Sequence, residues 1–162
     1  LKISLIAISA SAILTLAILV LSGSVKFIPS QIVPITGMIA GNAMTTIGLC
    51  YRNLNSLFRD QRQQILEKLS LGANPNQASR TILRETIKSG MQPSLDSAKT
   101  VGIVSLPGMM SGLMFAGTVP MTAIMYQIMV TFMLVAATSI SSYIASFLAY
   151  REFYNDRQQL RV

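Results

Sequence analysis

Met121–Ala149 reads MTAIMYQIMVTFMLVAATSISSYIASFLA and contains no Lys, Arg, Asp or Glu. The hydrocarbon core of a bilayer is about 30 Å thick, so a helix needs roughly 20 residues to cross it. This stretch is therefore long and apolar enough to span a membrane. Ile3–Ser22, Ile32–Cys50 and Val101–Thr118 lack charged residues in the same way. The sequence predicts an all-α fold, a polytopic transmembrane helical bundle forming a single membrane domain over residues 1–162.

The composition agrees with a membrane protein. Hydrophobic residues make up 51% of the chain and charged residues 12%, and the mean hydropathy is +0.53. The first apolar run exceeds the apolar region of a signal peptide, which has about 7–15 residues. Since the chain begins with Leu1 rather than Met, we expect an N-terminally truncated membrane protein with residues missing upstream.

The distribution of charge predicts the orientation. The net charge is +7, and the basic residues gather in the loop at 51–96 and in the tail at 150–162, whereas Lys26 stands alone on the other side. By the positive-inside rule, this loop, the tail and the start of the chain are cytoplasmic. We expect an integral membrane protein, in contact with lipid and not with nucleic acid. The basic residues of the loop are Arg52, Arg59, Arg62, Lys68, Arg80, Arg84 and Lys88.

Several kinds of active site are absent from the sequence. There is no His, Cys50 is the only Cys, and no Gly-rich loop ends in Gly-Lys-Ser/Thr. No carboxylate lies within the four predicted spans, so a proton relay inside the bilayer is not indicated. We therefore expect no catalytic residue, no metal site and no cofactor in this chain, and we do not interpret it as an enzyme.

The loop contains strong signals for a helical hairpin. The apolar spacing of Asn53–Leu71 predicts an amphipathic helix, and Gly72 suits the left-handed position that ends a helix. Asn74 is a good N-cap, with Gln77 in the place of a capping-box partner. The second helix is expected to end at Gly90, just before a proline.

Both predicted helices of the hairpin carry an apolar stripe. Such a stripe must be buried somewhere, on the membrane surface or on a partner protein. The alternative is an ordinary solvated loop that happens to form two helices. The stripe consists of Leu54, Leu57, Phe58, Ile65 and Leu69 on the first helix and Ala78, Ile82, Leu83 and Ile87 on the second.

The turn resembles the cytoplasmic coupling loop of ABC importer permeases, whose signature is Glu-Ala-Ala…Leu-Gly-Ala. Leu71-Gly72-Ala73 is similar to the core of that signature, and Glu67 to its acid. This sequence departs from the signature in two ways. Glu67 stands five residues before Gly72 instead of six, and the Leu-Pro that closes the signature is missing. The resemblance implies that Glu67, Leu71, Gly72, Ala73 and Asn74 couple the chain to an ATPase.

A longer resemblance runs from about Pro29 to Leu160. Val104-Ser-Leu-Pro-Gly-Met-Met-Ser-Gly112, followed by Tyr126-Gln127-Ile128, is similar to the UPF0014-like family of small ABC-transporter permeases. That family includes a bacterial iron exporter and plant aluminium-tolerance permeases. The resemblance implies a homodimer of permeases that exports iron or a metal-related solute. It also implies a cytoplasmic ABC ATPase subunit, encoded separately, which binds and hydrolyses the ATP.

Small and polar residues within the spans suggest packing sites and a transport path. Gly-x-x-x-Gly motifs begin at Gly37 and Gly108 and favour close helix packing. Pro107-Gly108 is also a candidate hinge. Asn42 and Gln127 are costly to leave unpaired in hydrocarbon, so they either bond between helices or line the path.

The Met residues offer a second set of candidates. Met109 and Met110, beside the candidate hinge, are weaker candidates for the path. Met121, Met125, Met129 and Met133 recur every four residues, and a soft-metal site and plain packing are both open, with packing favoured.

Two other functions remain open. A stand-alone channel or secondary carrier would need no ATPase. A membrane scaffold that recruits a cytoplasmic partner would keep the hairpin but would need no hinge at Pro107.

Overall fold

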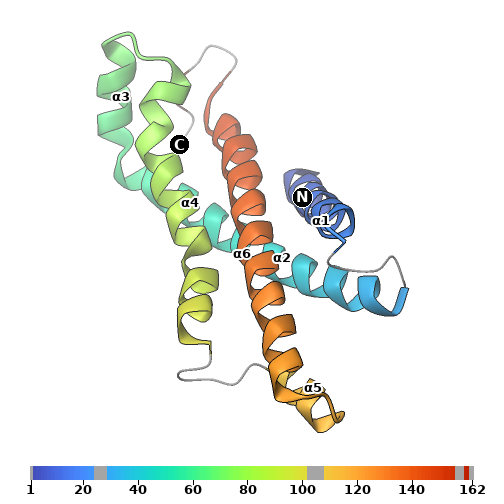
Figure 1. Cartoon of the computed structure of the whole chain (residues 1–162). Helices are drawn as coiled ribbons and strands as arrows, with labels where there is room; N and C mark the ends of the chain where they lie inside the picture. The colour runs from blue at the N-terminus through green and yellow to red at the C-terminus, as the bar shows by residue number, and fades with distance from the viewer. Residues whose placement is uncertain (1, 24–28, 102–107, 156–158, 161–162) are drawn as a thin grey trace.

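The computed structural model describes residues 2–23, 29–101, 108–155 and 159–160 (Figure 1). Its described part is helical, apart from turns and one isolated bridge between Tyr154 and Leu160, which confirms the all-α prediction. The elements are α1 (Lys2–Leu21), α2 (Pro29–Asp60), α3 (Arg62–Ser70), α4 (Pro75–Thr100), α5 (Gly108–Phe115), α6 (Pro120–Ala149) and the 3-10 helix η1 (Tyr150–Phe153).

Helix α6 is the centre of the bundle. It packs against α1, α2, α4 and α5, and α4 lies alongside it while α2 crosses both (Figure 1). Helices α3 and α4 form the hairpin at one end of the molecule, and α5 lies at the opposite end. The hairpin and α5 are therefore joined by the length of α6.

Three described helices are long and apolar enough to cross a membrane. They are Ile3–Leu21, Ile32–Asp60 and Pro120–Phe153, which cover the first, second and fourth predicted spans. Of the third, Val101–Thr118, residues 102–107 lie outside the described residues. The described remainder contains α5, a helix of 8 residues.

The prediction that the second hairpin helix ends at Gly90 is wrong. Helix α4 continues through Pro93 to Thr100. The reason lies in tertiary packing, because Gly90 is buried where α4 meets α2 and α6. A Cβ atom placed on Gly90 would clash with Sγ of Cys50 and would lie 3.6 Å from Cβ of Ser142. Gly90 therefore permits a close crossing of helices and does not end one.

The predicted single helix Asn53–Leu71 is also wrong. The membrane helix α2 continues into the hairpin as far as Asp60, and α3 begins after a break at Gln61. Leu54 and Phe58, which were predicted to belong to the hairpin stripe, are fully buried on the final turns of α2. The membrane span and the first side of the hairpin are thus one continuous helix.

The Gly-x-x-x-Gly motifs do not make the close contacts expected of them among the described residues. A Cβ added at Gly37, Gly41, Gly108 or Gly112 would meet no described heavy atom within 4 Å. Within the described chain, a glycine at a tight helix contact is found instead at Gly90.

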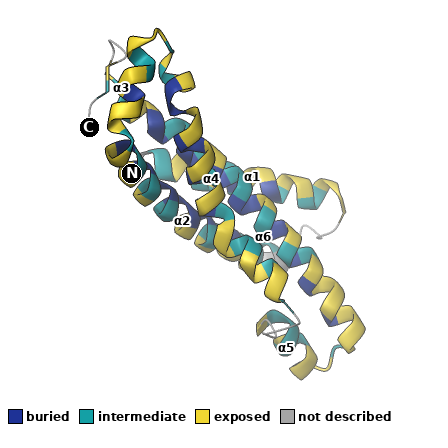
Figure 2. Cartoon of the chain, turned by 90° about the vertical axis from the view of Figure 1, so that its left-hand side faces the viewer, coloured by how far each residue is buried: buried dark blue, intermediate teal, exposed yellow. Residues whose placement is uncertain are grey.

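The buried residues form separate clusters along the bundle (Figure 2). One cluster fills the hairpin end. A second lies between α2 and α6, around Ile39, Val130 and Met133. The hairpin cluster is formed by Leu54, Phe58, Ile65, Ala78, Ile82, Leu83, Ala149 and Tyr150.

Candidate coupling hairpin and transport pocket

The turn between α3 and α4 is a Schellman motif. Gly72 has a φ of 87°, the left-handed conformation that glycine adopts without a Cβ penalty. The N–H of Gly72 donates to the carbonyl of Leu69 over 3.0 Å, and the N–H of Ala73 donates to that of Lys68 over 3.1 Å. These bonds close the end of α3 and confirm the helix-ending position predicted for Gly72.

The start of α4 has the predicted cap. Asn74 is extended, with φ −67° and ψ 153°, and Pro75 is the first residue of the helix. The N–H of Asn74 donates to Oε1 of Gln77 over 3.1 Å, which is the glutamine half of a capping box. The turn from Leu71 to Asn74 therefore has a defined shape.

The candidate coupling residues lie at the surface around this turn. Leu71 is 88% exposed, and Glu67 is exposed beside it. Both line a surface groove of about 890 Å³ that also contains Arg59 and Arg62. Gly72, Ala73 and Asn74 line a neighbouring groove of about 680 Å³ with Gln159 and Leu160. The surface thus presents an exposed apolar side chain next to charges of both signs.

The apolar stripe of the hairpin is buried within the chain itself, which corrects the expectation that membrane or a partner covers it. The end of α6, η1 and the following residues fold back onto α2, α3 and α4. The ring of Phe58 stacks on that of Phe153, with centroids 4.4 Å apart. The stripe is thus covered in the described part of the hairpin, whereas Leu71 at the turn remains exposed.

A hydrogen bond also joins the chain end to α4. The hydroxyl groups of Tyr154 and Ser79 form a hydrogen bond with each other. Burial raises the pKa of Tyr154, and the nearby Tyr150 adds to the rise, while the bond to Ser79 opposes it. The described part of the tail predicted at 150–162 is therefore packed against the hairpin.

Asn42 and Gln127, predicted separately as path residues, lie in one pocket. It has a volume of about 300 Å³ and is bounded by α2, α4 and α6. Among the described residues, its lining carries hydroxyl, amide and apolar side chains and no charged side chain. The lining residues are Asn42, Thr45, Thr46, Leu49, Pro93, Ser94, Ser97, Ala98, Thr100, Val101, Gln127, Thr131 and Leu134.

Gln127 is a pocket residue with a buried side-chain atom that has no hydrogen-bond partner among the described residues. Its side chain is 7% exposed, and its Nε2 donates to Oγ1 of Thr131 over 3.3 Å. Its Oε1 has no hydrogen-bond partner among the described residues. Asn42, by contrast, donates from Nδ2 to the carbonyl of Met38 over 2.9 Å. The buried oxygen of Gln127 can therefore accept a hydrogen bond or coordinate a cation.

The pocket also contains residues that the sequence analysis missed. Ser94, Ser97 and Thr100 reach it from α4, beyond the predicted end of that helix. The available signal was the spacing of Ser94, Ser97 and Val101, which lies on one helical face. Gly90 and Pro93 predict a helix end at this point instead, and the spacing is outweighed by these local stop signals.

The candidate methionines lie elsewhere. Met109 packs on the cluster around Ile39 and Val130, and Met110 is half-buried on α5; neither lines the pocket. Pro107 lies outside the described residues, and Gly108 is the first residue of α5.

The methionine series does not converge on one point either. Met121 and Met125 are mostly exposed, whereas Met133 is buried in the apolar cluster. The described residues contain no group of three His, Cys, Asp or Glu side chains that could hold a metal ion.

The comparisons with known proteins identify the family. The model of the uncharacterised protein family UPF0014 matches residues 1–154. The chain is 60% identical over 159 residues to an Escherichia coli protein named probable iron export permease protein FetB, covering 98% of this chain and 61% of that protein. No solved structure matches the chain.

Plant relatives are more distant. The chain is 37% identical over 158 residues to the UPF0014 membrane protein STAR2 of Oryza sativa, covering 98% of this chain and 55% of that protein. It is 36% identical over 156 residues to the protein ALUMINUM SENSITIVE 3 of Arabidopsis thaliana, covering 96% of this chain and 57% of that protein. The chain thus spans less than two thirds of each of these relatives. Three helices of membrane length lie in the described part of the chain, and the chain belongs to the UPF0014 family of integral membrane proteins.

Proposed function

We propose that this chain is part of the permease subunit of an ABC transporter that exports iron or a related metal species. A separate ATPase subunit would hydrolyse the ATP, and two permease chains would form a homodimer. The proposal places the protein in a bacterial inner membrane with the hairpin in the cytoplasm. The relative named as an iron export permease supports the cargo.

One observation carries the proposal: α4 is a continuous helix that links the coupling turn to the pocket. It starts directly after Asn74 and its 26 residues extend over about 39 Å at 1.5 Å per residue. Its last turns contribute Ser94, Ser97 and Thr100 to the pocket that holds Gln127. A displacement of the turn is therefore transmitted to the pocket without an intervening loop.

The aromatic cluster supplies a second connection. Phe58 near the end of α2 packs on Phe153, and Tyr150, which directly follows α6, belongs to the same buried cluster. Because α2, α4 and α6 are held together at the hairpin and all three also bound the pocket, movement of the hairpin would change the pocket's shape.

In the proposed cycle, ATP binding closes the ATPase subunits and moves the turn around Leu71. The pocket then opens alternately to the two sides of the membrane. Gln127 and Asn42 would contact the cargo. The Pro107-Gly108 pair, which joins the segment after α4 to α5, would act as the hinge.

Co-purification tests the partner. We expect the full-length protein, tagged and extracted in detergent, to retain a stoichiometric subunit that contains a P-loop, as identified by mass spectrometry. Leu71→Asp should abolish this association, because Leu71 is exposed at the turn and a buried charge at an interface is costly. Thr81→Asp, at another exposed position of the hairpin, should retain it.

Two outcomes would contradict the proposal. Export by the purified protein alone in vesicles, without ATP, would indicate a channel or secondary carrier. A stoichiometric partner that lacks a P-loop would indicate a scaffold.

A further inference from the structure

The final part of α4 lies beside the apolar span of α6. A Cβ on Gly90 would lie 3.6 Å from Cβ of Ser142, and Ser97 lines the same pocket as Gln127 and Thr131. Ser142, Thr131 and Gln127 all belong to the uncharged stretch of α6. The segment 90–100 of α4 therefore runs at the depth of a membrane span, which the sequence analysis had assigned mostly to a cytoplasmic loop.

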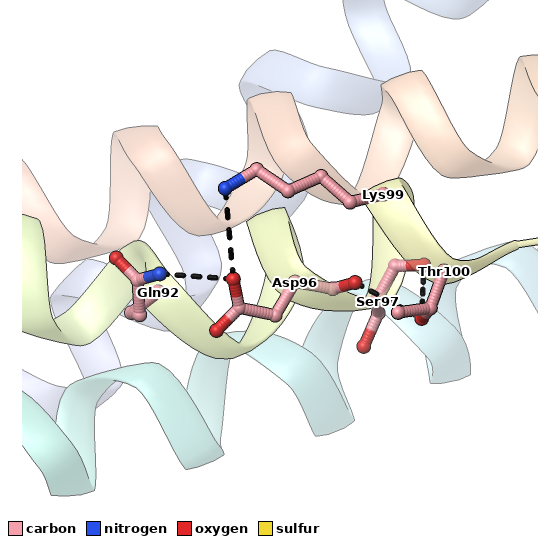
Figure 3. Close-up of polar contacts among 5 residues, drawn as sticks. All are labelled: Gln92, Asp96, Ser97, Lys99 and Thr100. Atoms are coloured by element: carbon pink, nitrogen blue, oxygen red, sulfur yellow. Dashed lines mark hydrogen bonds and ion pairs between the residues drawn. The ribbon is translucent and has the colours of Figure 1, made fainter.

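This segment is polar and carries an ion pair (Figure 3). Oδ1 of Asp96 accepts a hydrogen bond from Nε2 of Gln92 over 2.9 Å and lies 3.8 Å from Nζ of Lys99. The side chains of Lys99 and Asp96 are 72% and 54% exposed. A carboxylate, an ammonium and an amide thus lie together on an open face of α4, at the depth of an apolar helix.

Asp96 stands at the edge of the polar pocket. Residues three and four positions apart are neighbours on a helix surface, so Asp96 lies next to Pro93 and Thr100, and both line the pocket. Gln127 lines the same pocket, and its buried Oε1 has no partner among the described residues. The carboxylate and the unpaired amide oxygen therefore belong to one polar region.

The surroundings of this face follow from the cost of charge in lipid. Charged groups in the hydrocarbon are strongly disfavoured and typically face a water-filled cavity or another protein group. The outer face of α6 shows what a lipid-facing surface of this chain contains: Phe132 is 72% exposed and Ile128 49% exposed. The face around Asp96 has the opposite composition, so water is its expected environment.

We infer that the segment 90–100 of α4 forms the wall of an aqueous path through the membrane, and that Asp96 draws a cationic cargo from this path toward the pocket of Gln127. The inference rests on the proposed transport function and specifies the charge of its cargo. A cation arriving at Asp96 competes with Lys99 for the carboxylate. It then reaches the neutral oxygen atoms of the pocket, which bind it weakly enough for release.

Thiol labelling tests the water-facing assignment. The full-length protein in native membranes would carry Cys50→Ala, so that an added cysteine is the reactive one in this part of the chain. We expect Asp96→Cys to react with a membrane-impermeant, charged methanethiosulfonate reagent. Phe132→Cys, on the exposed apolar face of α6, should not react. Failure of Asp96→Cys to react would overturn the inference, as would disulfide-linked pairs of chains in place of labelling, because these would assign the face to a second copy.

Transport tests the role of the carboxylate. The probe is iron(II) in proteoliposomes that contain the complete transporter. We expect Asp96→Asn to lower the initial rate about tenfold, the scale of electrostatic attraction of a charged substrate. Glu85→Gln is the matched control, because Glu85 is exposed on the same helix and lies eleven residues, or about three turns, nearer the hairpin. It should change the rate less than about twofold.

The outcomes separate the inference from the proposed function. Equal rates in Asp96→Asn and Glu85→Gln would overturn the inference while leaving ATP-driven export in place. If the wild-type protein with its partner transports no iron(II), the proposal that iron is the cargo is contradicted. The labelling result then decides whether the path is aqueous, and an unlabelled Asp96→Cys overturns the inference independently.

Discussion

The two ends of α4 differ in how their neighbours pack. At the hairpin, large apolar and aromatic side chains fill the contact, and Phe58, Leu54 and Ile65 are essentially unexposed. At the pocket, Ser, Thr, Asn and Gln side chains share the lining with a smaller number of apolar residues, such as Leu49 and Leu134, around an open volume of about 300 Å³. Dense apolar cores resist deformation, whereas a small polar cavity with an unpaired oxygen can rearrange. From this difference we infer that the hairpin transmits movement and that the pocket binds the cargo.

The junction between these regions has small residues of its own. Cys50, Gly90 and Ser142 meet where α2, α4 and α6 cross, and the Sγ of Cys50 lies 3.9 Å from the carbonyl oxygen of Thr86. Small side chains let helices approach closely in a membrane protein. This crossing therefore fixes the position of α4 relative to α2 and α6 between the hairpin and the pocket.

The largest expected effect on stability is at the hairpin. Phe58→Ala should lower the free energy of unfolding by about 3–5 kcal/mol, because it removes a fully buried ring from a dense cluster. Phe132→Ala removes a phenyl ring from an exposed position. It should change the free energy of unfolding by less than about 0.5 kcal/mol. Denaturant unfolding in detergent, followed by circular dichroism, measures both. Equal losses would show that the hairpin cluster is not a packed core.

The crossing should show an intermediate effect. Gly90→Val places a side chain against Cys50 and should lower the free energy of unfolding by about 1–3 kcal/mol, as overpacking does. Adding Cys50→Ala should recover part of the loss. Gly48→Val serves as the control, since no described atom lies within 4 Å of its Cβ position. A loss in Gly90→Val that is no greater than in Gly48→Val would refute the close crossing.

A substitution in the pocket should raise the free energy of unfolding, whereas those at the hairpin and the crossing lower it. Gln127→Met replaces the unpaired buried amide with an apolar side chain of similar length, and should raise the free energy of unfolding by about 1 kcal/mol. Transport should fall in the same variant. Gln64→Met, at an exposed hairpin position, should change neither. A destabilised Gln127→Met protein would mean that the amide serves the fold and not the cargo.

Local signals predicted the turn well, and tertiary contacts explain the failures. The helix end at Gly72 and the cap at Asn74 depend on neighbouring residues alone, so the sequence contains all the information required. The extension of α4 past Gly90 and Pro93 depends on its packing against α2 and α6. This tertiary packing overrides the local stop signals. Asn42 and Gln127 could be selected individually as polar groups in spans. Their meeting in one pocket depends on where α2, α4 and α6 cross.

The measurement that tests the account most directly is the amount of cargo moved per ATP hydrolysed when α4 is weakened between its two ends. Lys88 and Ser89 are exposed on α4, between the hairpin core and the crossing. Replacing both with glycine lowers helix stability by about 1 kcal/mol per residue relative to alanine. The control replaces both with alanine.

With the double-glycine variant, we predict that the ATPase subunit still binds and hydrolyses ATP. The iron(II) exported per ATP should fall about fivefold or more relative to the double-alanine control, the scale on which coupled sites influence each other. An unchanged ratio of export to hydrolysis would contradict the claim that α4 couples the hairpin to the pocket.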